Sequence, residues 1–418
     1  MGPDALPALV LGLSPAGLAV VRSLGRLGVT VYGADPNPRS LGRYSRYCVH
    51  RPELGDAARR GEGDALVRGM LDLGRECGRP IILFAASDPF IELLAPAAER
   101  LAGAFRLTTD LARFGLPFLD KKRFYALCRE HGVELPPTWF PPGLEELEER
   151  APALEYPVVL KPARVHHFRS SLGIRKVQTA SGPAELVAAY RELARVDPEL
   201  IVQGVIPGAD DRIWCVAAYL DRESRPLATL IVRKLRQYPP GFGSASLAET
   251  RRNAEVERLT GSFLGAVGYH GLCDVEYKLD PRDGRYKMFE INPRVPVWAG
   301  LGPAAGVDVA VAAYRDAADA VRGRSAGIAE SSAGAPENPP RQADGVRWIY
   351  AARDVRSAAR LGRAGELSAG AWWRSLRNCR ADAVLAADDP GLLPRWALSK
   401  AARLPARAAR IVRRLPRG

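Results

Sequence analysis

Short apolar runs alternate with amphipathic segments over the first 115 residues of the chain. ALPALVLGL is an apolar run, LSPAGLAVVRSLGRLG repeats apolar residues with helical spacing, and VTVYGAD is a second apolar run that ends at Asp35. A strand, a helix and a strand in this order form a βαβ unit with parallel strands. RPIILFAASD and a predicted helix from Pro89 to Leu101 continue the alternation. The pattern predicts a doubly wound α/β domain over residues 1–115.

After residue 115 the pattern becomes that of an α+β structure. FLDKKRFYALCREHG predicts an amphipathic helix, and the prolines of VELPPTWFPP exclude helix from the next segment. A helix is also predicted from Ala248 to Val267. The strands of an antiparallel or mixed sheet are predicted at EYPVVLKPA, LIVQGVIPGADDRIWCVAAYL, PLATLIVRKLRQYP, GLCDVEYKLD and YKMFEINPR. DPRDG has the turn residues of a hairpin, which pairs the strand of Glu276 with that of Glu290.

These changes of pattern divide the chain into six parts. The segment from Ser325 to Gly345 is rich in Pro, Ser, Gly and Ala, and it is predicted to be a linker. The predicted parts are the first domain at 1–115, a smaller unit at 116–200, a larger unit at 201–324, the linker at 325–345, a small C-terminal unit at 346–389 and a tail at 390–418.

The composition is that of a globular protein. The chain has 418 residues, of which 47% are hydrophobic and 26% charged, enough for two or three domains. No apolar run reaches the roughly 18 residues that a transmembrane helix needs, so we expect a cytoplasmic protein. The six cysteines are scattered without a C-x-x-C pair, which argues against disulfides and a thiolate zinc site.

The net charge of +13 is concentrated at the C-terminal end of the chain. Residues 390–418 contain eight basic residues and no acid, and the other 389 residues carry only +5. We expect a solvated tail with weak attraction for anionic membranes and no specific nucleic acid partner. The alternative is a non-enzymatic binder whose tail grips an anionic membrane or a nucleic acid.

The segment KMFEINPR carries polar side chains on one face of a predicted strand. Because side chains alternate along a strand, Glu290 and Asn292 face the side opposite to Phe289 and Ile291. Glu276 lies on the other arm of the predicted hairpin, so three oxygen ligands can converge. Burying carboxylates without a partner is costly, and a hard cation such as Mg²⁺ is the usual compensation. The alternative is an ion pair between Glu290 and a nearby lysine or arginine.

Two cations accompany these acids. Lys161 follows the apolar YPVVL and precedes Pro162, so its ammonium leaves a buried strand beside a polar loop and suits a phosphate. The alternative for Lys161 is a lysine that only caps a strand at the surface. Arg294 follows Pro293, which breaks the strand, and is directed at the same region.

The polar loop after Lys161 offers further phosphate contacts. Ser170, Ser171 and Gly173 in RSSLGIRKV supply hydroxyl and amide groups that can fold over phosphates. Lys176 follows them. Loops of this composition are common, so the pattern alone is weak.

The segment IVQGVIPGAD suits the base and the sugar of a nucleotide. Gln203 ends an apolar strand, and the connection after it can present backbone groups to a purine edge through Gly204, Val205 and Ile206. Asp210, seven residues after Gln203, can accept hydrogen bonds from ribose hydroxyls.

Together these segments resemble the ATP-grasp superfamily. DK at residues 120–121, PPT at residues 136–138, YPVVLKPA, SSLGIRK, IVQGVIPGAD, VEYK and FEINPR occur in the order and approximate spacing of that fold, over residues 116–320. The first domain resembles the domain that precedes ATP-grasp modules. RKLRQYPPGFGSASLAET, with SLGRYSRYCV and FAASDPF upstream, is most similar to the carboxylate–amine ligase group that includes D-aspartate ligase.

The resemblance implies ATP and two Mg²⁺ ions as cofactors, a small subdomain with a phosphate lid at 116–200 and a large subdomain with the metal site at 201–324. It assigns phosphate binding to Lys121 and Lys161, and the lid to Ser170, Ser171 and Lys176. It makes Gln203, Gly204, Val205 and Ile206 the adenine hinge and Asp210 the ribose ligand. The implied metal ligands are Glu276, Glu290 and Asn292, and the implied catalytic cations are Arg294, Lys161 and Lys234.

Two positions depart from the family pattern. The hinge acceptor is often a glutamate, and here it is Gln203, whose carbonyl oxygen can still accept a hydrogen bond. D-alanine ligases carry an arginine two residues before the first metal carboxylate, where this chain has Asp274. The positive charge must then come from Arg294, Lys234 or Arg236.

The implied activity joins a carboxylate and an amine through an acyl phosphate, with release of ADP and phosphate. An amino acid or a small anionic acid is the implied substrate. Within the same fold, bicarbonate is the alternative phosphoryl acceptor. A nicotinamide-dependent oxidoreductase is the alternative outside it, suggested by GLSPAG and Asp35, although Ser14 replaces the second glycine of that fingerprint. The sequence leaves the oligomeric state open, with a homodimer as one arrangement.

Overall fold

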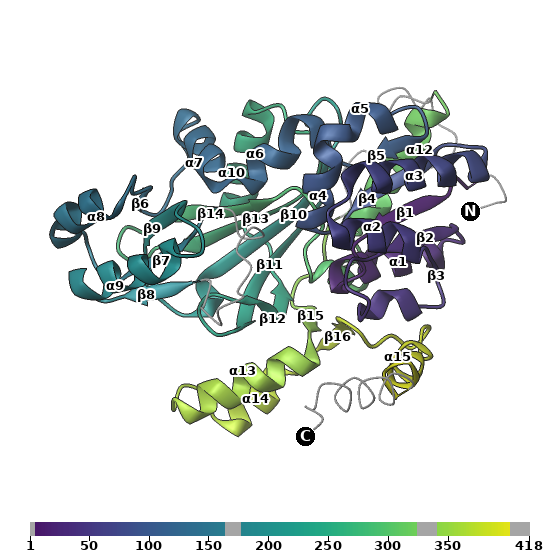
Figure 1. The fold of residues 1–418 in the computed structure, drawn as a ribbon. Helices are drawn as coiled ribbons and strands as arrows, with labels where there is room; N and C mark the ends of the chain where they lie inside the picture. The colour runs from purple at the N-terminus through teal and green to yellow at the C-terminus, as the bar shows by residue number, and fades with distance from the viewer. Residues whose placement is uncertain (1–4, 164–176, 324–340, 402–418) are drawn as a thin grey trace, which may run out of the picture.

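The computed structural model describes residues 5–163, 177–323 and 341–401 (Figure 1). Its first sheet is fully parallel, with strand order β3-β2-β1-β4-β5. The strands are β1 (Ala8–Leu11), β2 (Val31–Ala34), β3 (Cys48–His50), β4 (Ile81–Ala85) and β5 (Phe105–Leu107). The prediction of a doubly wound parallel domain at the N-terminus is confirmed.

Helices cover both faces of this sheet, as the alternating pattern requires. They are α1 (Pro15–Arg26), α2 (Pro52–Arg60), α3 (Gly63–Cys77), α4 (Asp88–Leu94) and α5 (Ala98–Leu101). The helix predicted from Pro89 to Leu101 is broken, because a 3₁₀ turn at Ala95–Ala97 separates α4 from α5. Pro96 lies in that turn, where it cannot donate the hydrogen bond of a continuous helix.

A second sheet of four strands has the order β6-β9-β7-β8. Its strands are β6 (Thr138–Trp139), β7 (Val158–Pro162), β8 (Gln178–Ala180) and β9 (Leu200–Gly204). Two helices pack on it, α8 (Leu144–Arg150) and α9 (Pro183–Ala194). In Figure 1 this small layer lies at the left and the N-terminal domain at the right, with the largest sheet between them.

The largest sheet has seven strands in the order β14-β13-β10-β11-β12-β15-β16. They are β10 (Ile213–Leu220), β11 (Pro226–Tyr238), β12 (Ser244–Thr250), β13 (Gly271–Leu279), β14 (Tyr286–Asn292), β15 (Arg347–Ile349) and β16 (Cys379–Asp382). The remaining helices before the C-terminal segment are α6 (Leu116–Leu119), α7 (Lys121–Glu130), α10 (Ala254–Ala266), α11 (Gly302–Ala305) and α12 (Val309–Val321).

Alternating residues of β10 divide the interior into two cores. Cys215, Ala217 and Tyr219 face the N-terminal domain and α12, in one continuous apolar cluster with residues of α1 and β1. Trp214 and Val216 face the opposite side, where aromatic residues of α7 and α10 pack. The N-terminal domain therefore covers one face of the large sheet, and the site described below lies along that face.

Two predictions about the large sheet have opposite outcomes. The hairpin at DPRDG is confirmed, because β13 and β14 pair with Glu276 directly opposite Glu290. The helix predicted to start at Ala248 is wrong at its beginning: residues 244–250 form β12, and α10 starts only at Ala254. Six of the seven β12 residues are buried between β11 and β15, so tertiary packing overrides the helix propensity of Ala and Glu.

The C-terminal segment extends the large sheet. β15 pairs antiparallel with β12, and β16 pairs parallel with β15. Three helices follow these strands: α13 (Ala351–Arg363), α14 (Ala369–Ser375) and α15 (Leu392–Ala401). The unit predicted at 346–389 therefore shares its strands with the large sheet, because the β12 edge is completed by β15. Gln342, within the predicted linker, is buried and hydrogen-bonds both backbone groups of Ile231.

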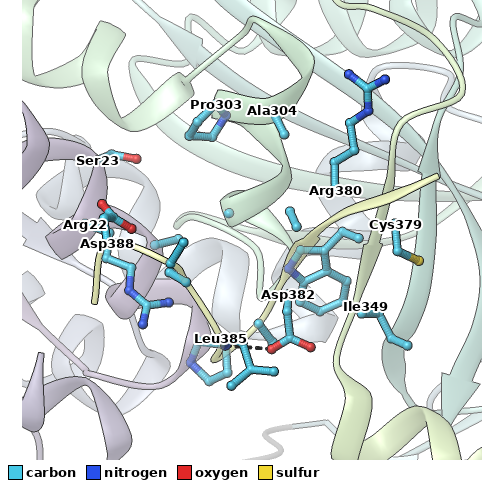
Figure 2. Close-up of a pocket in the computed structure, with 18 of the residues that line it drawn as sticks. Arg22, Ser23, Pro303, Ala304, Ile349, Cys379, Arg380, Asp382, Leu385 and Asp388 are labelled. Carbon is cyan, nitrogen blue, oxygen red and sulfur yellow. Dashed lines mark hydrogen bonds between the residues drawn. The ribbon is translucent and has the colours of Figure 1, made fainter. Parts of the chain in front are cut away.

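A hollow of about 750 Å³ lies between α1, α11 and this C-terminal segment. Figure 2 shows Ser23 and Arg22 on one side of it, Pro303 and Ala304 above, and Cys379 and Asp382 on the other side. All six cysteines, including Cys379, are free thiols. None of the described helices is both long and apolar enough to cross a membrane.

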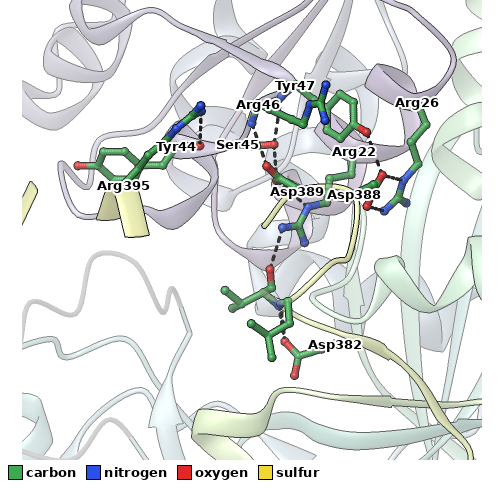
Figure 3. Close-up of polar contacts among 12 residues, drawn as sticks. Arg22, Arg26, Tyr44, Ser45, Arg46, Tyr47, Asp382, Asp388, Asp389 and Arg395 are labelled. Atoms are coloured by element: carbon green, nitrogen blue, oxygen red, sulfur yellow. Dashed lines mark hydrogen bonds and ion pairs between the residues drawn. The ribbon is translucent and has the colours of Figure 1, made fainter. Parts of the chain in front are cut away.

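Two adjacent acids hold the C-terminal segment to the N-terminal domain (Figure 3). Asp389 accepts hydrogen bonds from Arg22 at 3.0 Å and Ser45 at 2.7 Å, and the side chains of Arg22 and Asp389 are only 6% and 1% exposed. Asp388 pairs with Arg26, where both side chains are 39% exposed. The two ion pairs have the same chemistry in very different surroundings.

This contrast predicts different costs for two neighbouring substitutions. Asp389→Ala leaves Arg22 buried without its partner and should lower the free energy of unfolding by about 3 kcal/mol or more. Asp388→Ala is the matched control and should cost less than about 1 kcal/mol, because water screens the exposed pair. Urea unfolding of both variants measures the difference, and equal losses would contradict this view of the junction.

Candidate functional site

A cavity of about 430 Å³ lies among the four-stranded sheet, the large sheet and the N-terminal domain. It brings together eleven of the residues singled out in the sequence, from segments that span more than 170 positions. They are Lys121, Lys161, Gln203, Gly204, Val205, Ile206, Lys234, Glu276, Glu290, Asn292 and Arg294.

The floor of the cavity is the polar face of the β13–β14 hairpin. Glu276 lies opposite Glu290, and Asp274 lies opposite Asn292 on the next rung. Because side chains two apart on a strand share a face, these four side chains point to the same side. The cavity is lined by all four. The sequence pattern thus places three carboxylates and one amide side by side.

Lysines from other elements neutralise two of these carboxylates. Lys234 on β11 donates to Glu276 at 2.6 Å, and Lys121 at the start of α7 donates to Glu290 at 3.1 Å. Burial opposes the charge of Lys234, but Glu276 raises the pKa of Lys234 well above its usual value. Burial would likewise raise the pKa of Glu290, yet Lys121 and Lys161 lower it to about 2. The ion pair named as the alternative for Glu290 is therefore present, inside the same cavity as the predicted ligand set.

Lys161 is held without a carboxylate partner among the described residues. Its ammonium donates to the side-chain oxygen of Gln203 at 2.9 Å. The amide nitrogen of Gln203 donates in turn to the hydroxyls of Tyr125 and Thr138. Burial, together with the nearby charge of Lys121, lowers the pKa of Lys161 to about 7. Lys161 is thus a half-buried amine whose charged form an anionic ligand would stabilise.

The sequence had assigned Gln203 an adenine-binding role through its carbonyl oxygen. In the structure that oxygen accepts from Lys161, so the Gln203 side chain orients the lysine. The residues after it line the cavity, but two amides of this connection are already bound, Gly204 to Pro137 and Val205 to Pro157. Tyr125 and Thr138 were missed by sequence reasoning. Their signal is only that a buried Gln203 needs partners for its amide nitrogen.

Arg294 joins the site to the N-terminal domain. Its guanidinium makes two hydrogen bonds to Asp88 at the start of α4 and one to Asn292 at 3.2 Å. Burial opposes the charge, but Asp88 raises the pKa of Arg294. Asp88 was not singled out in the sequence. Asp88 is the third residue after the end of β4, in FAASDPF. In α/β proteins, ligands bind beyond the carboxyl ends of parallel strands. An acid just after a predicted parallel strand is therefore the sequence signal that could have identified Asp88.

Asp274 is the most isolated acid of the site. It is 4% exposed, one carboxylate oxygen has no hydrogen-bond partner among the described residues, and the other receives only a 3.5 Å contact from Asn292. Burial and the neighbouring Glu276 raise the pKa of Asp274 well above its usual value. Among the described residues, ligand atoms of Asp274, Glu276 and Cys215 lie within 4.8 Å of one another. The orphaned oxygen of Asp274 beside Glu276 fits the hard-ligand chemistry of Mg²⁺.

Two other predicted residues lie outside the cavity. The Asp210 carboxylate accepts hydrogen bonds from the backbone and side-chain nitrogens of Gln237 and so contacts β11. Its role as the ribose ligand stays a prediction. Arg236 is buried against Asp354 of α13 with hydrogen bonds of 2.9 and 2.8 Å. Of the three cations considered, only Lys234 and Arg294 line the cavity. The predicted lid residues Ser170, Ser171 and Lys176 lie outside the described residues.

The first βα turn gives little support to a nicotinamide site. The Asp35 carboxylate, which would bind the ribose in a nicotinamide site, accepts a hydrogen bond from the Leu13 amide of this turn at 2.5 Å. Gly12 has φ of +100°, and a Cβ on Gly17 would lie 1.7 Å from the Gly12 carbonyl oxygen. The tight turn and the close approach of α1 therefore explain both glycines without a bound pyrophosphate.

The chain is similar to known proteins in both sequence and fold. The family model of the carbamoyl-phosphate synthase L chain, ATP-binding domain, matches residues 244–321. Among solved structures, the biotin carboxylase domain of Hydrogenobacter thermophilus 2-oxoglutarate carboxylase, crystallised with MgADP, ADP and bicarbonate, aligns with a TM-score of 0.58 at 16% identity, over 75% of this chain and 70% of that one. The L-amino acid ligase of Bacillus licheniformis aligns with a TM-score of 0.56 at 15% identity, over 76% and 75%.

These matches confirm the resemblance stated above: the chain has the ATP-grasp fold, preceded by a parallel α/β domain. At the level of sequence, the chain is similar to the D-aspartate ligase of Enterococcus faecium. The two are 28% identical over 245 residues, which cover 54% of this chain and 57% of that ligase. The chain thus spans little more than half the length of this relative.

The low pKa of Lys161 predicts a pH-dependent affinity for ATP. Burial and Lys121 lower the pKa of Lys161 to about 7, and bound phosphates should raise this pKa again. Above pH 7, binding must therefore take up a proton, and ATP affinity should fall by up to about tenfold for each pH unit. Calorimetric titrations between pH 6 and pH 9 measure this slope. Lys161→Met is the control, since ATP's own titration is common to both proteins, and an unchanged slope would contradict the assignment.

Proposed function

We propose that the protein is an ATP-dependent carboxylate–amine ligase that forms an amide through an acyl phosphate and releases ADP and phosphate. One observation carries the proposal: the acids of the β13–β14 hairpin, the lysines that neutralise them and Arg294 line a single cavity. A site that must hold a triphosphate and cations needs this combination of charges. The similarity to a D-aspartate ligase and the structural likeness to an L-amino acid ligase support it.

ATP would bind between the small and large sheets. Lys121 and Lys161 would contact its phosphates, the connection from Gln203 to Ile206 would border the base, and Asp210 would bind the ribose if Gln237 releases it. Ser170, Ser171 and Lys176 would complete the phosphate contacts, as the resemblance implies.

Glu276, Glu290 and Asn292 would hold Mg²⁺, two ions in our proposal. The metal would neutralise the phosphate charge and polarise the phosphoryl oxygens. Lys234 forms an ion pair with Glu276, and Lys121 forms one with Glu290. Both ammonium groups must therefore move away from these carboxylates when a metal binds. The ammonium groups would then pair with the phosphates of ATP in place of the two glutamates.

The first chemical step transfers the γ-phosphoryl group to the acid substrate. A carboxylate oxygen attacks the γ-phosphorus, the bond to the β–γ bridging oxygen breaks, and ADP leaves. Lys161 and Lys234 stabilise the charge on the transferred group. Arg294, exchanging Asp88 for substrate, orients the acid and then the acyl phosphate.

In the second step an amine attacks the acyl carbon, the bond from that carbon to the phosphate oxygen breaks, and the amine nitrogen gives up a proton. No covalent enzyme intermediate is required, because the acyl phosphate is already activated. The substrates we propose are an amino acid or another small anionic acid, together with an amine. Arg294 and Lys234, which line the cavity beside the proposed metal ligands, suit an anionic substrate.

Hydroxylamine provides the direct test of this chemistry. With ATP, Mg²⁺ and a pool of amino acids and small acids, we expect hydroxamate together with equal amounts of ADP and phosphate. Release of AMP and pyrophosphate would overturn the acyl-phosphate route. ADP release that depends on bicarbonate, without hydroxamate from any acid, would instead favour the carboxylase-type alternative.

Glu290→Gln tests the metal ligand. The side chain of Glu290 is 36% exposed, and glutamine keeps an oxygen that can accept a hydrogen bond from Lys121, so we expect the variant to fold. Its melting temperature should be lower than that of the parent, because the buried Lys121 loses its charged partner. Loss of the ligand charge should reduce turnover by roughly 100-fold or more. Glu134→Gln removes an exposed acid paired with Arg285 and is the control with unchanged turnover. Full activity of Glu290→Gln would remove this residue from the mechanism.

A further inference from the structure

The segment 351–380, called the C-terminal hairpin below, has an unusual excess of arginine. It contains four arginines in α13, at positions 353, 356, 360 and 363, and three more at 374, 377 and 380. Six of the seven are exposed, and Arg353 is half-buried. No carboxylate within the described part of the chain forms an ion pair with any of them, whereas exposed arginines such as Arg59, Arg191 and Arg258 each pair with a carboxylate.

The acids of the hairpin do not balance this charge. Only Asp354 and Glu366 are acidic in residues 351–380. Asp354 is fully buried and accepts hydrogen bonds from Arg236, Ser246 and Trp372. Its charge is therefore balanced by Arg236 inside the protein and does not offset the charge of the surface arginines. The outer surface of the hairpin therefore presents six exposed cations against one exposed carboxylate, Glu366.

Large apolar side chains lie among these cations. Trp372 is anchored through its indole nitrogen to Asp354 at 2.9 Å, but its neighbour Trp373 is 70% exposed. Val355, directly after the buried Asp354 on α13, is 53% exposed. Trp373 is the most exposed of the large apolar side chains that the structure describes. An indole is apolar along its body and polar at its nitrogen, so exposed tryptophan among cations suits a partner surface that is apolar inside and charged at its boundary.

The position of the hairpin leaves this surface open. Figure 1 shows α13 and α14 at the lower edge of the molecule, beyond β15 and away from the helices of the N-terminal domain. Asp354 and Ser357, the buried residues of α13, fix its inner side to β11 through Arg236 and the Gln237 carbonyl. Farther along the sequence, residues 402–418 add six arginines and no acid.

We propose that the C-terminal hairpin docks on an anionic lipid surface. Guanidinium groups would bind lipid phosphates, and Trp373 with Val355 would enter the boundary between headgroups and acyl chains. Charge complementarity supports an anionic partner, and the exposed indole and isopropyl groups favour a lipid boundary over a purely polar polyanion. The proposal does not depend on the reaction catalysed, because the hairpin shares none of the cavity-lining residues of the candidate site.

Co-sedimentation of the full chain with vesicles tests the proposal. We expect binding to phosphatidylcholine vesicles containing about 30 mol% phosphatidylglycerol, weakening as salt rises, and none to phosphatidylcholine alone. Arg356→Glu with Arg363→Glu should lower the affinity at least roughly tenfold. Trp373→Ser, which keeps the charge, should weaken binding at high salt, where the apolar contact dominates.

The matched control is Arg68→Glu with Arg75→Glu on α3, which changes the net charge equally on another part of the molecule. It should retain vesicle binding. An equal loss in this control would mean attraction by overall charge and would overturn the assignment to the hairpin. Absence of vesicle binding by the parent protein would overturn it as well. So would binding of a labelled oligonucleotide, lost in the hairpin variants, without vesicle binding. Unchanged melting temperatures exclude misfolding of the variants.

Discussion

The pairing of Glu276 and Glu290 of the β13–β14 hairpin with the buried lysines Lys234 and Lys121 is the interaction on which the candidate site depends. Glu276 and Glu290 are opposed on adjacent strands, and like charges at this separation repel one another unless cations intervene. Lys234 and Lys121 supply those cations from β11 and α7. The four side chains thus form two internal ion pairs, and a metal–nucleotide complex can replace them with equivalent external ones.

Elements far from the β13–β14 hairpin keep this cluster of acids and lysines in place. The N-terminal domain contributes Asp88, which holds Arg294 over the acids. On the other side, Asp354 of α13 holds Arg236 of β11, two residues beyond Lys234, where the pairing of β11 with β12 is irregular. The outer segments therefore help to position two of the cations that line the cavity, Arg294 and Lys234. This dependence explains in physical terms why an α/β domain and a C-terminal extension accompany the nucleotide-binding layers.

Local patterns predicted most of the fold and of the candidate site. Turn residues and strand periodicity sufficed to place Glu276 opposite Glu290, because hairpin register is a short-range property. Partners contributed by distant segments could not be predicted in this way. The link from Arg294 to Asp88 joins positions 206 residues apart, and the strand at Ala248 forms because β15 covers it from nearly 100 residues away. Asp210 was expected at the ribose but hydrogen-bonds Gln237, a contact that only the folded β11 creates.

The central claim is that internal ion pairs are exchanged for metal and nucleotide contacts, and a crystal structure with MgADP tests it most directly. The account predicts a metal bound by Glu276, Glu290 and Asn292, with the ammonium groups of Lys121 and Lys161 on phosphate oxygens and Lys234 withdrawn from Glu276. Nucleotide bound elsewhere, or both lysine–glutamate pairs intact beside a bound nucleotide, would contradict it.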